Sequence, residues 1–437
     1  MTPDFPRRIG FWGGSAIMVG CIIGSGVFRT PAAIAKEMGS PMLVLAFWLA
    51  GGFLSLFGAL AYAELGTMFP RSGGIYVYLN RGFGGPVSFV FGWTYMLLAK
   101  PLAAAAISMV FAEHLNQLLG VAWDPRIATC VLLVGLTALN TPGTRLGAGV
   151  AIVLTALKVL ALAGIVGLGL VLFQGNSANF AATPAPRSIL SAVAPVMAAV
   201  LWTYDGWSDV AAVSGEVKEP QRTLPRILLA GTMAVTLLYL AVNAVYLWLV
   251  PLSEMRTVST VAPLVMERLV GPIGGTVVTV MILVSTLGAS HGSILTGARV
   301  TWAQSRDGLL FRFLGRVHPT FGTPDVSLWV QAALSCVAAV FLGTFERLAG
   351  GFVFTMWIFY ALAVAAVILL RIRRPDLERP YRCWGYPVLP ILFVAAAVAV
   401  TVLSILDSPS TTLPWLGVLL AGAPVYYLWR RISGSSG

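Results

Sequence analysis

The 437-residue chain is 58% hydrophobic and has a mean hydropathy of +0.86, whereas only 10% of its residues are charged. Soluble domains carry roughly 25% charged residues, so the composition excludes a water-soluble protein and indicates a polytopic membrane protein. The net charge of +11 comes from basic residues in short loops. This pattern is typical of membrane topology signals rather than of nucleic-acid binding.

Apolar runs of about the length that a membrane-spanning helix needs follow one another along the chain. They centre near residues 10–36, 41–66, 86–112, 127–140, 147–173, 189–214, 225–250, 273–299, 326–343, 347–370, 387–406 and 412–430. The fourth run is short, and no loop is long enough to fold by itself. The sequence therefore predicts an all-α protein with twelve transmembrane helices, forming a single transmembrane domain over residues 1–437.

The basic residues are distributed unevenly between the two sides of this topology. With the N-terminus inside, 19 of the 28 lysines and arginines fall in inner loops. Six fall in outer loops: Lys36, Arg126, Arg187, Arg256, Arg268 and Arg347. Because short inner loops are enriched in basic residues, we expect both termini to be cytoplasmic.

The first apolar run is interrupted by Gly24, Ser25 and Gly26. A helix that restarts near Val27 presents free N–H groups and a positive dipole end, which suit a carboxylate, and Ser25 adds a hydroxyl donor. We expect the preceding half-helix to leave carbonyl groups free near Cys21 and Ile22.

The sixth run is interrupted by the segment "WTYDGWSD", residues 202–209, which contains Gly206 and two carboxylates. The two interruptions lie five spans apart, so the second half enters the membrane inverted relative to the first, with repeats at about 8–173 and 187–370. Matched interruptions in inverted halves indicate a transporter's binding site. Carbonyls freed at 202–205 suit an ammonium, so the two breaks together describe a site for an amino acid zwitterion.

Two lysines lie within predicted spans, where charge is costly and usually functional. Lys158 is about 16 Å from the cytoplasmic end of its span, beyond the roughly 6 Å reach of its side chain. It should point into the bundle as a fixed charge or as a titrating amine. Lys100, which precedes Pro101, either pairs with carbonyls freed by a kink or has a functional role.

Four further polar residues have alternative roles. Asp205 either contacts substrate or caps the second half of its span, and Asp209 fits a cap or gate. His291 fits a helix contact or a lining of the pathway. We expect Glu64, at the end of the second run, to pair with an inner-loop arginine such as Arg71.

The aromatic residues around the second break complete the candidate site. Trp202 is placed to lie over a ligand as a gate, and Tyr204 and Trp207 are expected to shape a side-chain pocket. The chain lacks phosphate-loop, zinc and nucleophile-elbow motifs, and its four cysteines are scattered. We therefore expect no enzyme activity, no cofactor and no metal site.

Several motifs resemble one known superfamily. The segments "IGFWGGSAIMVGCIIGSGVFRTP", "YAELGTMFPRSGGIYVYL" and "TYDGWSDVAAVSGEVKEPQRTLPRI" resemble the first span, the span 2–3 junction and the sixth span of amino acid–polyamine–organocation (APC) transporters. Together with "LLAKPLAAAAISMVFAEHL" they resemble the L-type amino acid transporter (LAT) family, in particular its bacterial serine/threonine and alanine-serine-cysteine exchangers. The similarity covers nearly the whole chain.

The resemblance implies a five-plus-five inverted-repeat fold of the LeuT/APC type, with discontinuous helices 1 and 6 and additional helices at about 387–431. It implies alternating access and sodium-independent exchange of amino acids. The substrate carboxylate would bind at the first break and the amine at the second. The family's binding positions fall on Ile22, Gly24, Ser25, Gly26, Trp202 and Asp205. The gating aromatic falls on Trp202, and the lysine on span 5 falls on Lys158.

Two departures from the family limit what this resemblance implies. The loop "NQLLGVAWDPR" has no cysteine, so we expect no disulfide-linked heavy chain, and a monomer. Asp205 replaces the glycine of large-neutral members, which leaves lysine and arginine open as substrates.

The sequence predicts an inner- or plasma-membrane exchanger of small neutral L-amino acids such as alanine, serine, threonine and cysteine. The alternatives are proton-coupled uptake with Lys158 as the titrating group, and transport of cationic amino acids or polyamines using Asp205. A receptor that binds an amino acid without moving it is a third possibility.

Overall fold

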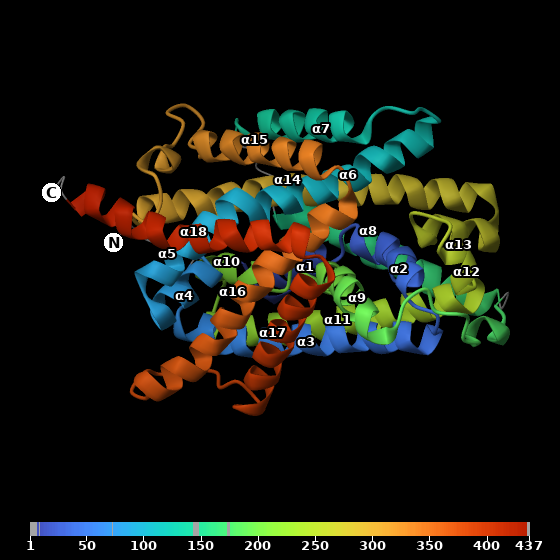
Figure 1. The fold of residues 1–437 in the computed structure, drawn as a ribbon, viewed down its shortest axis with the longest axis horizontal. Helices are drawn as coiled ribbons and strands as arrows, with labels where there is room; N and C mark the ends of the chain where they lie inside the picture. Colours follow the sequence, from blue (N-terminus) through green and yellow to red (C-terminus); the bar gives the residue numbers. More distant parts are fainter. Residues whose placement is uncertain (1–6, 8, 72, 143–147, 173–174, 435–437) are drawn as a thin grey trace.

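The computed structural model describes residues 7, 9–71, 73–142, 148–172 and 175–434. Residues 8 and 173, at the bounds of the first predicted repeat, lie outside the described residues. The described part is helical and contains no β-strand; an isolated bridge joins Ile9 to Val217. Most long helices run roughly along the long axis of the molecule (Figure 1).

The helices of the first half follow the predicted order. They are α1 (Phe11–Ile22), α2 (Gly26–Glu37), α3 (Pro41–Met68), α4 (Ile75–Phe83), α5 (Gly85–Thr94), the π-helical turn η1 (Tyr95–Ala99), α6 (Lys100–Leu119), α7 (Pro125–Asn140) and α8 (Ala148–Val171).

The second half begins after a 3₁₀ turn, η2 (Ser177–Phe180). It contains α9 (Ile189–Tyr204), α10 (Asp209–Ala212), η3 (Ser214–Glu216), α11 (Pro220–Leu249), α12 (Leu252–Met255), α13 (Val261–Val270), α14 (Pro272–Arg306), η4 (Arg312–Gly315), α15 (Asp325–Leu342) and α16 (Phe345–Arg373). Helices α17 (Val388–Asp407) and α18 (Pro409–Gly434) follow.

The predicted all-α polytopic membrane fold is confirmed. Within the described residues, nine helical segments are long and apolar enough to cross a membrane, and three shorter apolar helices occupy Pro125–Asn140, Thr155–Val171 and Ile189–Tyr204. Each coincides with one of the apolar runs. The sequence prediction missed the short helices α4 and α13, which lie in segments that were expected to be loops.

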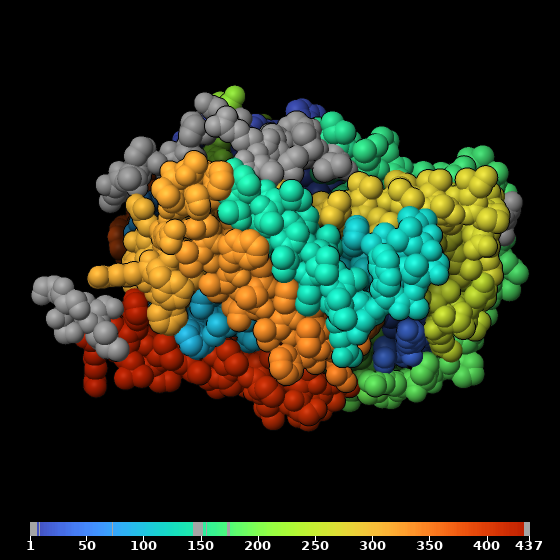
Figure 2. Space-filling view, turned by 90° about the horizontal axis from the view of Figure 1, so that it is seen from above, coloured from blue at the N-terminus to red at the C-terminus, as the bar shows by residue number. Residues whose placement is uncertain are grey.

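The outer face of the bundle is apolar. Helices α7 and α15 lie side by side on one face (Figure 2), and Ile127, Val131 and Phe341 are exposed there. Leu160 is likewise exposed on α8. A soluble monomer does not present such continuous apolar surface to water, so these side chains face lipid.

Local sequence signals determine where several spans begin. Ser40 accepts a hydrogen bond from the Leu43 amide before Pro41 starts α3, and Asp124 caps α7 in the same way before Pro125. These side chains satisfy amides that have no intrahelical partner, and proline at the first helical position loses nothing there.

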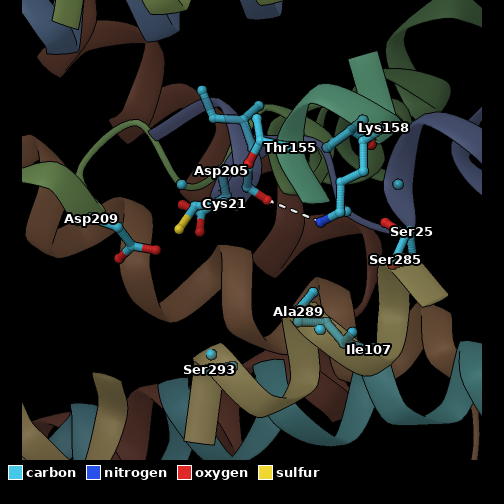
Figure 3. A pocket seen from close by; sticks show the side chains of 18 of the residues that line it. Cys21, Ser25, Ile107, Thr155, Lys158, Asp205, Asp209, Ser285, Ala289 and Ser293 are labelled. Atoms are coloured by element: carbon cyan, nitrogen blue, oxygen red, sulfur yellow. Dashed lines mark hydrogen bonds between the residues drawn. The ribbon is translucent and has the colours of Figure 1, made fainter. Parts of the chain in front are cut away.

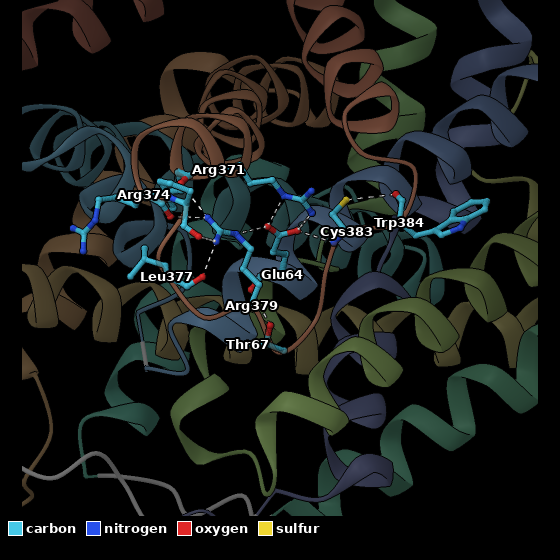
Figure 4. A network of polar contacts seen from close by, with 10 residues as sticks. Glu64, Thr67, Arg371, Arg374, Leu377, Arg379, Cys383 and Trp384 are labelled. Carbon is cyan, nitrogen blue, oxygen red and sulfur yellow. Dashed lines mark hydrogen bonds and ion pairs between the residues drawn. The ribbon is translucent and has the colours of Figure 1, made fainter.

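A buried ion-pair network joins α3, α16 and the segment that leads to α17 (Figure 4). Arg371 donates to both carboxylate oxygens of Glu64, with N–O distances of 3.0 and 2.6 Å. The Cys383 amide donates to Oε2 at 2.6 Å, and Arg379 Nε lies 3.5 Å from Oε1. The expected pairing of Glu64 with an arginine of a predicted inner loop is confirmed, but the partners are Arg371 and Arg379 and not Arg71, the example that was suggested. The partners of Glu64 lie about 300 residues away in sequence, so local spacing gave no signal for them.

Candidate functional site

The two helix interruptions meet inside the bundle. Helix α1 ends at Ile22 and α2 begins at Gly26, while α9 ends at Tyr204 and α10 begins at Asp209. Helix α2 packs against α9, and α1 packs against α10. The predicted discontinuity of spans 1 and 6 is thus confirmed, and the two spans run antiparallel to each other.

Glycines permit this close approach. Gly206 has φ +116°, and a Cβ there would lie 2.8 Å from the backbone of Cys21 and Ile22. A Cβ on Gly26 would lie 2.5 Å from Thr203 Oγ1 and 2.9 Å from Thr203 Cα. Gly24 differs, because a Cβ added there would meet no atom within 4 Å. At Gly206 and Gly26, each break therefore packs against the backbone or side chain of the other.

The start of α2 presents unpaired donors. Among the described residues, the amides of Ser25, Gly26 and Val27 have no hydrogen-bond acceptor, and the buried Ser25 hydroxyl has no partner. These groups lie at the positive end of a helix, where an anion is stabilised. The arrangement provides a site for a carboxylate.

The carbonyl side of the first break differs from the expectation. The Ile22 carbonyl accepts hydrogen bonds from the Gly24 amide at 2.8 Å and from the Tyr239 hydroxyl at 2.9 Å. The expectation of a free carbonyl at Ile22 is therefore wrong, because a buried carbonyl requires a partner and α11 supplies one. The Trp202 carbonyl accepts the Asp205 amide at 3.2 Å and retains a second lone pair.

A cavity of about 430 Å³ lies at the junction of the breaks. Of the predicted site residues, it is lined by Ile22, Gly24, Ser25, Gly26, Lys158, Trp202, Asp205 and Gly206. Figure 3 shows Ser25 and Lys158 toward one end of the lining and Cys21 and Asp209 toward the other. Residues that are hundreds of positions apart in sequence are brought together here.

Tyr204 and Trp207 lie outside the cavity lining. The Tyr204 ring packs edge-on against Trp48, at a centroid distance of 5.9 Å. The Trp207 ring packs against Tyr62 at 4.8 Å. Both side chains point into the protein core and not into the cavity. They pack against other rings, so the expectation that they shape the pocket is wrong.

Sequence reasoning overlooked the contribution of α14 to the lining. Val280, Met281 and Val284 line the cavity at one end of this face, and small residues spaced three or four positions apart line the rest: Ser285, Gly288, Ala289, Gly292, Ser293 and Thr296. This spacing places them on one helical face. The periodic small residues were a readable signal for this face. Thr155 from α8 was also overlooked.

Lys158 connects α8 to the end of α1. Its ammonium donates to the carbonyls of Gly20 at 3.2 Å and Ile23 at 3.0 Å. One turn away on α8, the Thr155 hydroxyl donates to the Ala16 carbonyl at 2.9 Å. The lysine thus pairs with carbonyls that the end of α1 cannot satisfy within the helix.

Asp205 is oriented by the α16 side of the cavity. The Tyr360 hydroxyl donates to Asp205 Oδ1 at 2.6 Å, and the Ser208 hydroxyl donates to Tyr360 at 3.1 Å. The carboxylate therefore has one oxygen fixed by a neighbouring helix and lines the cavity.

No group of three or more acidic, histidine or cysteine side chains suited to a metal ion occurs within the described residues.

Trp202 separates this cavity from a second one of about 490 Å³ toward the α13 end of the bundle. Its ring lies edge-on to Phe345 and Phe352, at 5.7 and 5.3 Å. Arg29 lies over the Phe345 ring, 4.7 Å from its centroid. Trp202 and its aromatic neighbours form a layer between the two spaces.

Arg29 closes this layer with two ion pairs. It binds Glu113 of α6 and, at 2.9 Å, Glu346 of α16, and the arginine is only 7% exposed. We name Arg29, Glu113 and Glu346 the Arg29 cluster. It joins three helices on the α13 side of Trp202.

The remaining intramembrane residues are placed as follows. Lys100 lines the cavity directly after η1, and its ammonium lies 5.6 Å from the Tyr95 ring centroid. His291 lies outside the lining, and its buried Nε2 has no hydrogen-bond partner among the described residues.

Two broken, antiparallel helices that meet at an internal cavity define the architecture of a secondary transporter. Comparison with known proteins agrees: residues 9–424 match the family model for amino acid permeases. The chain belongs to the amino acid permease family, within the APC superfamily, and is an amino acid transporter rather than an enzyme.

The chain is similar over nearly its whole length to curated members of this family. It is 33% identical to the serine/threonine exchanger SteT of Bacillus subtilis, over 98% of each chain. It is 30% identical to the b(0,+)-type amino acid transporter 1 of Rattus norvegicus, over 98% of this chain and 88% of the relative. It is 31% identical to the human cystine/glutamate transporter, over 97% and 85%. The resemblance drawn from the sequence motifs is thereby confirmed.

Proposed function

We propose that the protein is a sodium-independent exchanger of small neutral L-amino acids, which works by alternating access. One observation carries the proposal: the unpaired amides of Ser25 and Gly26 and the unpaired Ser25 hydroxyl lie at a cavity that the Trp202 segment also lines. The substrate carboxylate binds the amides, and its ammonium binds carbonyls of the second break near Trp202. Ile22, Gly24 and Gly206 shape the backbone around it.

Lys158 supplies a fixed cation beside the first break. Its ammonium binds two backbone carbonyl oxygens at the end of α1. In a sodium-coupled transporter, such oxygens at a broken helix coordinate the metal cation. A cation that is covalently part of the chain cannot follow an ion gradient, so we propose exchange instead of sodium-coupled uptake. Trp202 serves as the gate toward the second cavity.

The proposed substrate class rests on charge as well as on similarity. The lining contains two cationic side chains, Lys158 and Lys100, and two carboxylates, Asp205 and Asp209. The balance of positive and negative charge favours neutral ligands. A relative of comparable length is named a serine/threonine exchanger. The cationic alternative rests on Asp205 alone, and one oxygen of that carboxylate is bound to Tyr360.

We further propose the topology and assembly that the basic residues and cysteines favour. Both termini face the cytoplasm, and the chain lies in the cell membrane. Repeats at about 8–173 and 187–370 are related by inversion, and the helices at 387–431 are additional. The protein works as a monomer without a disulfide-linked heavy chain.

Exchange is tested with purified protein in liposomes that contain unlabelled serine or no amino acid. Labelled serine should enter only the loaded vesicles, at a rate that is independent of Na⁺ and of a pH gradient. Uptake into empty vesicles driven by an acidic exterior would replace the exchanger with proton-coupled uptake, with Lys158 as the titrating group.

Two further results would contradict the proposal. Preferential exchange of lysine, arginine or a polyamine would favour the cationic carrier. Binding of an amino acid without any counter-transport would favour the receptor.

A further inference from the structure

A small extension of the main cavity has its own polar lining. It has a volume of about 30 Å³, and Lys100, Asp205, Asp209 and Phe352 line both it and the main cavity. A space of this size holds one or two water-sized groups. Tyr95, Ser208 and Tyr360 complete its polar wall.

Two charged groups in this extension lack an ionic partner. Lys100 is 8% exposed and lies against the Tyr95 ring, and it makes no ion pair with a carboxylate in the described part of the chain. Asp209 begins α10, and across the described ranges its carboxylate makes neither a hydrogen bond nor an ion pair. Asp205 differs, because Tyr360 binds one of its oxygens. A donor and an acceptor are therefore available at the same small space.

The chemistry of these two groups restricts the ligand. Buried polar groups are costly unless they are paired, and a hydroxyl can accept from an ammonium while it donates to a carboxylate. A methyl group in the same position gives neither of them a hydrogen bond, although Lys100 keeps its contact with the Tyr95 ring. A cationic side chain is placed beside the Lys100 ammonium, and an acidic one beside Asp209 and Asp205.

We propose that Lys100 and Asp209 form the side-chain subsite of the transporter, and that they select short neutral side chains that both donate and accept a hydrogen bond. Serine and threonine fit the small volume, and the carboxamide of asparagine carries the same chemistry. The subsite lies at the Asp209 end of the lining, opposite Ser25 (Figure 3), where the side chain of a ligand anchored by its carboxylate points. This inference rests on the proposed function.

The subsite is tested by competition in proteoliposomes loaded with unlabelled serine. Threonine and valine are nearly isosteric, as are asparagine and leucine, so each pair isolates the polar group. Wild-type protein should bind threonine at least about tenfold more tightly than valine. Valine has no hydroxyl group, so it leaves the polar groups of the subsite without a hydrogen-bond partner. Asparagine measured against leucine shows whether a carboxamide is accepted as well as a hydroxyl.

Lys100→Met and Asp209→Ala should each bring the threonine-to-valine ratio close to one, chiefly by weakening threonine. Lys36→Met removes a lysine at the far end of α2, outside the main cavity, and should leave the ratio unchanged. Unaltered ratios in both subsite variants would overturn the proposal. If both variants fail to fold, the wild-type ranking decides: equal competition by valine and threonine, or strongest competition by lysine, overturns it.

The experiment separates this inference from the proposed function. Absence of counter-transport for every amino acid contradicts amino acid exchange itself. Counter-transport without discrimination between threonine and valine contradicts only the subsite.

Discussion

Lys158 is the residue whose contacts most directly link two helices of the site. It crosses from α8 to the carbonyls of Gly20 and Ile23, which lie on either side of Ile22 at the end of α1. Hydrogen bonds to a charged donor contribute about 1.5–3 kcal/mol. The neighbouring Thr155 bond to Ala16 joins the same two helices without a charge, so the pair provides a matched comparison.

Lys158→Met should therefore slow exchange at least about tenfold, since 1.4 kcal/mol corresponds to a factor of ten. The apparent affinity should change less, because the lysine holds α1 rather than the ligand. Thr155→Val should stay within about twofold of wild type. Initial rates and half-saturation constants of serine exchange measure both effects. Equal rates for Lys158→Met and wild type would give the lysine a purely structural role.

The glycines at the breaks differ in what they tolerate. Gly206→Ala places a Cβ against the Cys21–Ile22 backbone at a φ of +116°, where L side chains are strained. We expect a lower thermal unfolding midpoint in detergent and loss of exchange. Gly24→Ala meets nothing within 4 Å and should keep the wild-type midpoint. The prediction fails if the two variants unfold at the same temperature.

At the scale of helices, the Arg29 cluster joins α2 to α6 and α16 on the α13 side of Trp202. Removal of Arg29 leaves Glu113 and Glu346, whose side chains are 28% and 53% exposed, without the cation that they share, so α2 is no longer tied to α6 and α16. The closed arrangement should therefore lose population to one that is open toward the α13 end.

Cys21 lines the main cavity and can report this opening in a protein whose other three cysteines are replaced by alanine. Arg29→Gln should raise the rate of Cys21 labelling by an impermeant maleimide, added on the α13 side, by about tenfold. Arg347→Gln removes a nearby exposed arginine and serves as the control. Identical labelling rates in the two variants would show that Arg29 does not close the cavity.

The Glu64 network lies at the other end of α16 and is expected to contribute to stability rather than to gating. It holds α3, α16 and the Cys383 segment together. Glu64→Gln should lower the unfolding midpoint by several degrees, since breaking a buried ion pair costs about 3 kcal/mol or more. Asp376→Asn breaks an exposed pair with Arg374 and should leave the midpoint unchanged. Differential scanning fluorimetry measures both variants, and similar midpoints would contradict the prediction.

The element scale also shows what could be predicted from sequence. Hydropathy and length located every span, and Gly24, Gly26 and Gly206 located both breaks, because these signals are local. Partners across the bundle carried no local signal. Tyr239 at the Ile22 carbonyl and Arg371 at Glu64 depend on tertiary packing. The small residues of α14 repeat at helical spacing, but which cavity they line also depends on tertiary packing. The prediction that Tyr204 and Trp207 shape the pocket was wrong for the same reason. Closeness to the break in sequence does not determine whether a side chain points into the cavity or into the protein core.

For the whole molecule, α7 and α15 form an outer layer that contributes nothing to the described lining of the main cavity. Cys130 of α7 and Cys336 of α15 face each other, and each sulfur lies within 3.9 Å of the other residue's carbonyl oxygen. If alternating access moves the broken helices against a stationary layer, these cysteines keep their separation throughout the cycle.

Copper-phenanthroline oxidation should therefore join Cys130 to Cys336 and leave serine exchange within about twofold of the untreated protein. A Cys130→Ala variant treated in the same way controls for oxidation elsewhere. Loss of exchange that depends on Cys130 would mean that α7 and α15 separate during transport.

The position of Lys158 also has a thermodynamic consequence under the proposed exchange. A charge that is bonded to the chain returns with the protein after every cycle, so no ion gradient performs work on the substrate. At equilibrium the inside-to-outside concentration ratio is then the same for every amino acid that the carrier accepts. The protein would equalise these ratios across its substrates, and net accumulation of any one amino acid would depend on another system that supplies its exchange partner.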